Sequence, residues 1–284
     1  MTKFEYYQHS FLPDIPEQPI SEKLSFAQIQ RSYEQSNRNE RKSAFFASYI
    51  TEFDCETSTN WWFTIKDSEY NVSFLPAKKR YEITKARKFC RTEKIDTDDY
   101  IDEIIECYIE SFSGYPELYR PKNFNKQELR KQFEFIISSK NYRLYGTFFK
   151  ENKKLIGFTY VKRQGDFVRL ISQKTIPCYE KYNSNAALLD CLLEDWNDEL
   201  RNGTVVITNG SRSIKHQTNF NEYLEKYFGF RKAYSKLRIV YRFPLNLLIP
   251  CLKPFINFFE KSNSHFCYNI YCVLKMDSFK EKKR

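Results

Sequence analysis

A polar segment late in the chain gathers side chains that suit proton transfer and anion binding. It reads Asn209-Gly210-Ser211-Arg212-Ser213-Ile214-Lys215-His216-Gln217-Thr218-Asn219. Because an unperturbed imidazole titrates near pH ~6.5, His216 is our candidate general base, and a solvated or capping histidine is the alternative. Arg212 could pair a carboxylate or phosphate, or it could be a surface cation. We predict substrate contacts from Asn209, Ser211, Arg212 and Asn219.

Several common chemistries lack their residues in this chain. None of the 7 glycines precedes Gly114, so the Gly-rich phosphate loops of nucleotide kinases and dinucleotide-binding dehydrogenases are missing. The histidines, His9, His216 and His265, are far apart and no CxxC pair occurs, so we expect no metal site. No GxSxG sequence is present. We interpret Cys178 as a buried thiol in preference to a nucleophile.

The segments that would hold these side chains follow a regular order from residue 90 onward. Apolar residues at helical spacing predict helices, and runs joined by Gly, Asn and Asp turns predict strands. The predicted elements are a strand at 91–95, helices at 99–113 and 126–138, strands at 143–150, 154–162 and 167–176, a helix at 183–201, a strand at 204–208, a helix at 218–228 and a strand pair at 233–243. The order is therefore βααβββαβαββ.

The N-terminal third is less regular. Pro13, Pro16 and Pro19 predict an irregular arm, followed by a surface helix before residue 45. Residues 45–75 contain short β-forming runs separated by turn residues, and this pattern predicts a small antiparallel sheet. The segment 77–88 is rich in Lys and Arg and predicts a basic helix.

The element order resembles that of the GNAT superfamily of N-acetyltransferases, and three short segments are similar to sequence motifs of that superfamily. Leu155-Ile156-Gly157-Phe158 resembles the entry to its third strand, and Ile176-Pro177-Cys178-Tyr179 resembles the end of its fourth. Tyr227-Phe228-Gly229-Phe230 resembles the Gly-Phe that closes its fourth helix. The resemblance implies a mixed α/β acyl-CoA N-acyltransferase fold, with a mostly antiparallel central sheet flanked by helices and a small N-terminal β-containing lobe.

The same resemblance implies a place for the donor. The family binds the pyrophosphate of coenzyme A on a Q/R-x-x-G-x-G/A loop, where this chain reads Glu180-Lys181-Tyr182-Asn183-Ser184-Asn185, without glycine. Backbone N–H groups and the helix dipole still favour phosphate there. The implied cofactor-binding residues are Ile176, Tyr182, Asn183, Ser184, Asn185 and Ala186. The resemblance also implies Tyr223 and Tyr227 as candidate leaving-group acids and Tyr115 as a residue beside the acceptor.

A second resemblance concerns the basic segment. Lys78-Lys79-Arg80-Tyr81-Glu82-Ile83-Thr84-Lys85-Ala86 is similar to a segment between the two GNAT-like halves of Fem-type peptidyltransferases. That resemblance implies aminoacyl-tRNA as the donor and residues 1–89 as a truncated first half. We accordingly expect a small lobe at 1–89, an acyltransferase domain at 90–245 and an extension at 246–284.

Composition bounds the setting of the protein. With 41% hydrophobic and 29% charged residues, the chain is in the globular range. Its formal charge of +10 favours an anionic partner, or is that of a basic soluble protein. The cysteines are scattered without a CxxC pair, and charged residues near the N-terminus argue against a signal peptide. We therefore expect a cytoplasmic protein. Prolines interrupt the apolar stretch 243–259, so we expect no membrane span, and we expect this stretch to pack on the main domain in preference to a membrane surface.

Two classes of function remain open from the sequence. The first is an acyltransferase that moves an acyl group from acyl-CoA to an amine or hydroxyl of a small molecule, sugar or peptide, with aminoacyl transfer from a tRNA as its variant. The second is a binding protein that keeps the GNAT shape without catalysis.

Overall fold

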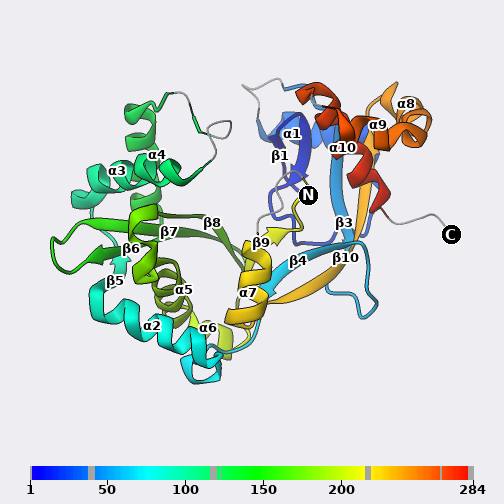
Figure 1. Cartoon of the computed structure of the whole chain (residues 1–284). Coiled ribbons are helices and arrows are strands. Elements are labelled where there is room, and N and C mark those ends of the chain that lie inside the picture. Colours follow the sequence, from blue (N-terminus) through cyan, green and yellow to red (C-terminus); the bar gives the residue numbers. More distant parts are fainter. Residues whose placement is uncertain are drawn as a thin grey trace. The chain divides into compact units, whose positions relative to one another are not determined.

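A computed structural model describes residues 2–37, 42–115, 120–121, 123–214, 219–262 and 264–280. The chain divides into two compact units (Figure 1). The central unit comprises Ile65–Asn209 and Glu222–Phe230. The terminal unit comprises Met1–Thr64, Gly210–Asn221 and Arg231–Arg284. The expected domain limits at residues 89 and 245 stay a prediction, which limited proteolysis can test.

The central unit is built on a sheet whose strands follow the chain in order. Its strands are β5 (Cys90–Ile95), β6 (Tyr142–Phe149), β7 (Leu155–Gln164), β8 (Phe167–Thr175) and β9 (Val206–Ser211). β5 to β8 form an antiparallel meander, and β9 pairs parallel with β8. This order confirms the predicted meander, because each short turn leaves the next strand no partner but its neighbour.

Helices cover both faces of this sheet (Figure 1). One face carries α3 (Ile101–Ser111) and α4 (Lys126–Ser138), and the other carries α2 (Ala77–Phe89) and α5 (Ser184–Asp195). The predicted apolar stripe of α3 is buried: Ile101, Ile104 and Ile105 pack with Phe133 of α4 against the sheet. Each of these helices is thus held by one apolar face. The remaining elements of the region are η1 (Val72–Phe74), η2 (Asp98–Tyr100), η3 (Phe112–Gly114), η5 (Pro177–Tyr182), α6 (Asn197–Arg201) and α7 (Phe220–Phe228).

Two predictions for this unit need correction. The helix expected over 183–201 is two helices, α5 and α6, divided at Trp196, whose backbone is not helical. The buried indole of Trp196 stacks on the Arg143 guanidinium at 3.6 Å. The small sheet expected over residues 45–75 does not extend to its last residues, because Val72–Phe74 form the short helical turn η1, capped by the Asn71 side chain.

The terminal unit joins the two ends of the chain. Its strands are β1 (Phe4–Tyr7), β2 (Ser10–Pro13), β3 (Phe46–Glu52), β10 (Arg231–Tyr241) and the greater part of β4 (Trp61–Lys66). β1 and β2 form a hairpin, β2 runs parallel to β3, and β3 pairs antiparallel with β10. The irregular arm predicted at the N-terminus is therefore wrong for residues 4–13. The pair of strands predicted at 233–243 is one strand, and its neighbours in the sheet, β3 and β4, come from the N-terminal part of the sequence.

Helices complete the terminal unit. α1 (Phe26–Ser36) begins at a capping box in which Ser25 and Gln28 exchange hydrogen bonds. The C-terminal elements are α8 (Leu245–Leu252), η6 (Lys253–Phe255), α9 (Ile256–Lys261) and α10 (His265–Ser278). None of the helices in the described ranges is long and apolar enough to cross a bilayer. The predicted fold class, mixed α/β with mostly antiparallel strands and flanking helices, is confirmed.

Candidate functional site

The parallel strands β8 and β9 separate soon after they pair. Phe167–Arg169 face Val206–Thr208, but among the described residues the edge of β8 beyond Arg169 has no further partner in β9. The opposite edge of β8 stays paired with β7 as far as Thr175. An extra residue, Ile171, interrupts that ladder as a β-bulge. The result is an open strand edge whose N–H and C=O groups can bind an extended ligand.

Helix α5 begins directly beyond this open edge. Its entry residue, Asn183, has a left-handed backbone with φ 59° and ψ 37°, which Asn tolerates better than most residues. The Asn183 carbonyl accepts hydrogen bonds from Ala186 N–H at 3.0 Å and Ala187 N–H at 3.2 Å. The N–H groups of Ser184 and Asn185 have no acceptor within the described parts of the chain. Two aligned donors at the positive end of a helix dipole form an anion site.

Unpartnered side-chain atoms lie at the same place. The Gln173 amide nitrogen donates to Asn185 Oδ1 at 2.9 Å and so ties β8 to the first turn of α5. Gln173 Oε1 and Ser184 Oγ are buried without a hydrogen-bond partner in the described structure. Buried polar atoms normally have partners, so these two are explained best by a bound group or water.

This donor set fits the phosphate of a carrier such as coenzyme A. The free N–H groups of Ser184 and Asn185 supply the hydrogen bonds that glycine-loop backbones supply elsewhere, and Asn183 supplies the left-handed turn. Lys181 adds an exposed cation next to the helix start. Glu180 is exposed as well, and its carboxylate opposes the binding of an anion there.

The other residues implied for the donor contribute packing. Ile176 and Ala186 are buried in the core of the central unit. The Tyr182 ring lies 4.7 Å from Phe149 and 5.2 Å from Phe89, in an aromatic cluster under η5. Asn183, Ser184 and Asn185 are therefore the part of the implied set that lies at the helix start.

Lys174 provides a cation on the α3 side of the same strand. Its Nζ donates to Tyr115 Oη at 3.0 Å and lies 4.4 Å from the Phe112 ring and 4.8 Å from the Tyr115 ring. The Tyr108 ring follows at 5.9 Å. No carboxylate of the described residues pairs with Lys174, so its charge is held by aromatic rings alone. Tyr115, a predicted substrate contact, belongs to this cage.

Tyr223 and Tyr227, the candidate leaving-group acids, surround a different lysine. Lys79 Nζ lies 4.4 Å from each of the two rings and 3.3 Å from Tyr223 Oη. It also forms an ion pair with Glu82. Burial raises the pKa of the Tyr223 hydroxyl, which makes it a weaker acid. The two tyrosines thus hold α7 on α2, and their predicted role in catalysis stays a prediction.

The predicted substrate residues of the polar segment divide between the units. Asn209 ends the central-unit part of β9, whereas Ser211, Arg212 and Asn219 belong to the terminal unit. The Arg212 guanidinium lies 4.0 Å from the Trp62 ring and 4.0 Å from the Phe279 ring. Its Nη1 donates to the Asn60 carbonyl at 2.7 Å. His216, the candidate base, lies outside the described residues.

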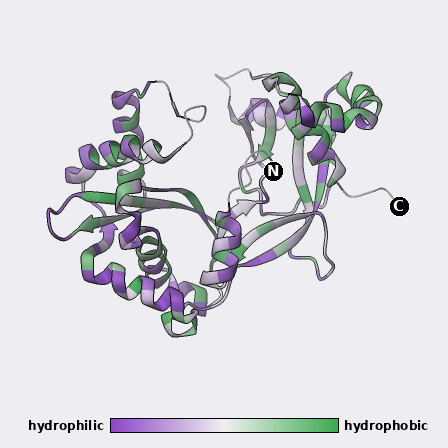
Figure 2. Ribbon diagram, in the orientation of Figure 1, coloured by the Kyte–Doolittle hydropathy of each residue, from purple (hydrophilic) through white to green (hydrophobic). Residues whose placement is uncertain are grey.

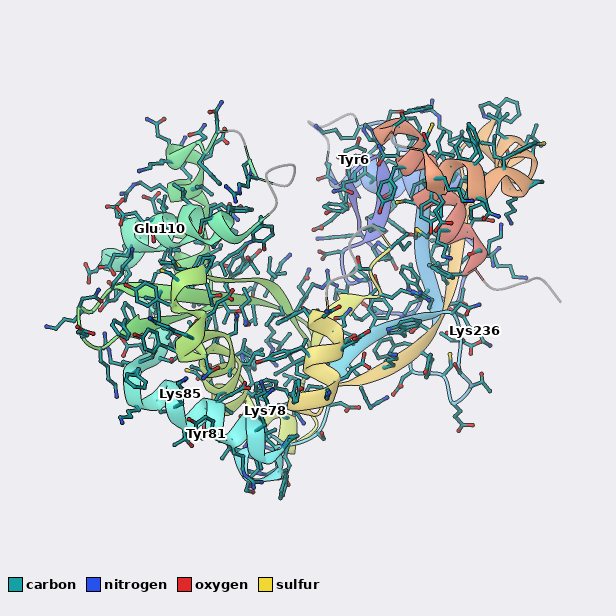
Figure 3. All side chains as sticks on the ribbon, viewed as in Figure 1. Tyr6, Lys78, Tyr81, Lys85, Glu110 and Lys236 are labelled. Atoms are coloured by element: carbon teal, nitrogen blue, oxygen red, sulfur yellow. The ribbon has the colours of Figure 1, made fainter. Side chains whose placement is uncertain are left out.

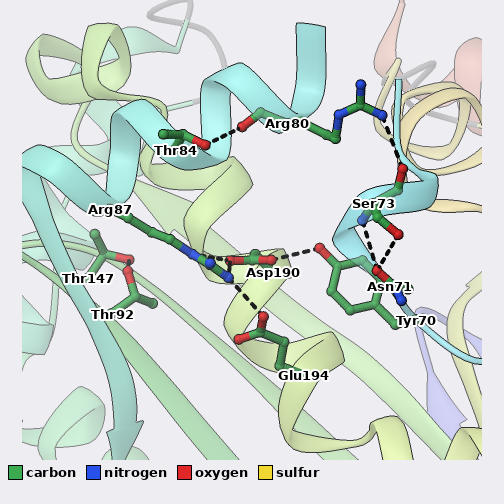
Figure 4. A network of polar contacts seen from close by, with 10 residues as sticks. All are labelled: Tyr70, Asn71, Ser73, Arg80, Thr84, Arg87, Thr92, Thr147, Asp190 and Glu194. Atoms are coloured by element: carbon green, nitrogen blue, oxygen red, sulfur yellow. Dashed lines mark hydrogen bonds and ion pairs between the residues drawn. The ribbon is translucent and has the colours of Figure 1, made fainter. Parts of the chain in front are cut away.

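A groove of about 890 Å³ lies elsewhere on the central unit, between α2, β5, β6 and α5. Asp190 of α5 is buried there and accepts from Tyr70 Oη at 2.7 Å and from Arg87 Nη2 at 2.8 Å (Figure 4). Arg87 also reaches Glu194 at 2.8 Å. Because both carboxylates are occupied by Arg87, we interpret the network as a brace between α2 and α5. Its sequence signal is a single acid in the apolar run 186–193.

The chain was compared with known proteins. No family model and no curated protein matches it. Among solved structures, it is similar to the C-terminal domain of a proposed lysylphosphatidylglycerol synthetase from Agrobacterium fabrum, with 10% identity over 88% of this chain and 83% of that one, at a TM-score of 0.46.

Two acetyltransferase structures are also similar to parts of the chain. The PaiA N-acetyltransferase of Thermoplasma acidophilum, in complex with coenzyme A, has 20% identity over 37% of this chain and 72% of its own, at a TM-score of 0.30. A GNAT family acetyltransferase of Staphylococcus aureus has 17% identity over 40% of this chain and 81% of its own, at a TM-score of 0.30. The second carries the name of the superfamily that the sequence resembles.

Proposed function

We propose that the protein is a GNAT-type acyltransferase whose donor is an acyl-CoA. The observation that supports this most is the early separation of β8 from β9, with the free N–H groups of Ser184 and Asn185 just beyond the open edge. An extended, phosphorylated thioester matches both features. Its arm pairs with the strand edge and its phosphate binds the helix start.

The chemistry assigned to this arrangement is nucleophilic attack on the acyl carbonyl. Coenzyme A supplies the acyl group as a thioester. The edge of β8 that faces away from β7 is unpaired with β9 beyond Arg169, and its N–H groups can bind the carbonyl oxygen as it gains negative charge. A base must remove a proton from the attacking amine or hydroxyl, and His216 remains our candidate for that role. As the new C–N or C–O bond forms, the C–S bond of the thioester breaks, and coenzyme A leaves as a thiol after its sulfur takes up a proton.

The acceptor is proposed to enter on the α3 side, beside Lys174 and Tyr115. A cation that has no carboxylate partner in the described residues favours an acceptor with an anionic group. A small molecule, a sugar or a peptide could carry both that group and the amine or hydroxyl that reacts.

Aminoacyl-tRNA is the second candidate donor, and two observations favour it. Side chains replace glycine throughout the loop before α5, and Glu180 adds a negative charge there. Helix α2 also presents exposed basic residues, Lys78 among them (Figure 3), and cations on one helix suit a nucleic-acid backbone.

A thermal-shift titration of the purified protein with acetyl-CoA tests the first candidate. A ligand at a hundredfold excess over its Kd stabilises the folded state by about 2.7 kcal/mol. We expect a saturable rise in Tm with acetyl-CoA and none with acetate. No rise at millimolar acetyl-CoA would contradict the proposal and leave aminoacyl-tRNA as the donor to test by gel shift.

A further inference from the structure

The C-terminal helices are anchored to the terminal unit from one side. Ile249 of α8 and Leu274 of α10 are buried. The buried Asp277 carboxylate accepts a hydrogen bond from Tyr241 Oη of β10 at 2.9 Å and forms an ion pair with Lys253 Nζ at 2.5 Å. These contacts fix α8, η6 and α10 against β10, so the side chains pointing the other way have a defined position.

The C-terminal helices and the residues that lead into them expose several large apolar side chains. Six large side chains there are exposed by 47 to 74% of their surface, and we call them the C-terminal apolar surface: Phe243, Leu247, Leu248, Phe255, Phe258 and Phe266. Figure 2 shows the hydrophobic residues of α8 and α9 in this region. Single exposed apolar residues are common, but a group of this size on adjoining helices marks an interaction surface. Within the stretch that we expected to pack on the main domain, Ile249 is buried, whereas Leu247, Leu248 and Phe255 are exposed.

Positive charge flanks the C-terminal apolar surface. Among the described residues from 242 to 280, five are basic (Arg242, Lys253, Lys261, Lys275 and Lys280) and two are acidic (Glu260 and Asp277). Asp277 pairs with Lys253 and Lys280, and Glu260 accepts from Tyr271 Oη at 2.7 Å, so Arg242, Lys261 and Lys275 are the described cations outside the Asp277 cluster. The flank is therefore cationic overall.

The combination selects an anionic lipid surface over a second copy of the chain. A two-fold dimer through this surface would bring two cationic flanks together, and like charges would oppose it. Lipid headgroups of negative charge would attract the same flanks, while phenylalanine and leucine insert at the boundary of the acyl chains. The helices are too short to span a bilayer, so the contact is peripheral.

We propose that the C-terminal apolar surface docks the protein on anionic phospholipid bilayers. The inference is independent of the proposed acyl transfer. It predicts that the full-length protein co-sediments with vesicles of equimolar phosphatidylcholine and phosphatidylglycerol and much less with vesicles of phosphatidylcholine alone. Added salt should weaken the binding without abolishing it, because the apolar contribution is insensitive to screening.

A double substitution tests the surface directly. F255S/F258S removes two exposed phenyl groups and should lower the partition coefficient on the anionic vesicles at least about tenfold. The matched control is F74S/Y81S, which removes two aromatic side chains of similar exposure, 72% and 67%, from the central unit. The control should bind as the wild type does. All four side chains are exposed, so circular dichroism should show unchanged folding.

Three outcomes would overturn the proposal. The wild type could stay in the supernatant with anionic vesicles at low salt. The two double variants could lose binding equally, which would show that the position of the aromatic residues is irrelevant. Sedimentation velocity could instead show a dimer that only F255S/F258S dissociates, which would assign the surface to a second copy of the chain.

Discussion

Lys79 and Lys174 are both held by aromatic rings in the central unit, yet their surroundings differ in one respect. Lys79 is buried between Tyr223 and Tyr227 and also pairs with Glu82. Lys174 lies against Phe112 and Tyr115 and pairs with no carboxylate of the described residues. A cation that is neutralised inside its cage stabilises the fold. A cation left without a counter-ion at the end of an open strand is available to a ligand.

The largest expected effect separates the two lysines by stability. Lys79→Gln leaves the mostly buried Glu82 carboxylate without its partner and should lower the free energy of unfolding by roughly 2–4 kcal/mol. Lys174→Gln keeps a hydrogen-bond donor for Tyr115 and should change the free energy of unfolding by less than about 0.5 kcal/mol. Urea unfolding followed by tyrosine and tryptophan fluorescence measures both. Equal losses of stability in the two variants would contradict the difference that we assign to Lys79 and Lys174.

A charge placed at the start of α5 should weaken donor binding while preserving the fold. Asn185→Asp keeps the oxygen that accepts from Gln173 and suits the helix dipole, but it repels phosphate. We expect an affinity for coenzyme A that is about ten- to a hundredfold lower. Asn197→Asp is the matched control, because Asn197 also begins a helix and accepts a hydrogen bond, from Tyr70 N–H at 2.6 Å. Loss of affinity in the control as well would contradict the assignment.

A third group of lysines extends the comparison to the terminal unit. Burial raises the pKa of Asp277, but hydrogen bonds from Lys253, Lys280 and Tyr241 outweigh burial and leave that pKa below its usual value. The unfolded chain therefore binds more protons, and the stabilisation is complete above about pH 4 and is lost as the pH falls further. Asp277→Asn should be less stable at neutral pH and should unfold with a weaker acid dependence. If the free energy of unfolding, measured in urea at a series of acidic pH values, falls with pH in Asp277→Asn as it does in the wild type, Asp277 does not contribute to the acid dependence of stability.

The smallest expected effect concerns the opposing charge in the loop before α5. Glu180→Gln should tighten coenzyme A binding by about two- to fivefold at low salt, and the gain should shrink as salt screens the exposed carboxylate. Glu151→Gln, an exposed position in the turn between β6 and β7, removes the same charge elsewhere. The same gain in Glu151→Gln would assign the effect to net charge instead of to the site.

Local pattern predicted much of the central unit and little of the terminal one. The apolar spacing of Ile101, Ile104 and Ile105 specified α3, and tight turns specified the β6–β8 meander. The pairing of β3 with β10 joins residues 184 to 195 positions apart, and no local pattern contains that information. Pro13 suggested an irregular arm, although it lies at the end of a strand where its missing N–H costs nothing.

The residues of the candidate site were also predictable only in part. The resemblance placed the donor near Asn183, Ser184 and Asn185, and a helix does begin there. The sequence analysis did not identify Gln173 and Lys174 as site residues. Strand alternation predicts that their side chains point to opposite faces of the sheet, but it does not predict which residues each side chain contacts. Only the packed structure shows that one reaches Asn185 and the other the Tyr115 hydroxyl.

Calorimetric titration of the wild-type protein with coenzyme A and with pantetheine tests the central claim most directly. Both ligands carry the extended arm, but only coenzyme A carries the phosphates assigned to the N-terminus of α5. We predict that coenzyme A binds saturably and that pantetheine binds at least about tenfold more weakly. Equal affinities, or no binding of either ligand, would contradict a phosphate site at Ser184 and Asn185.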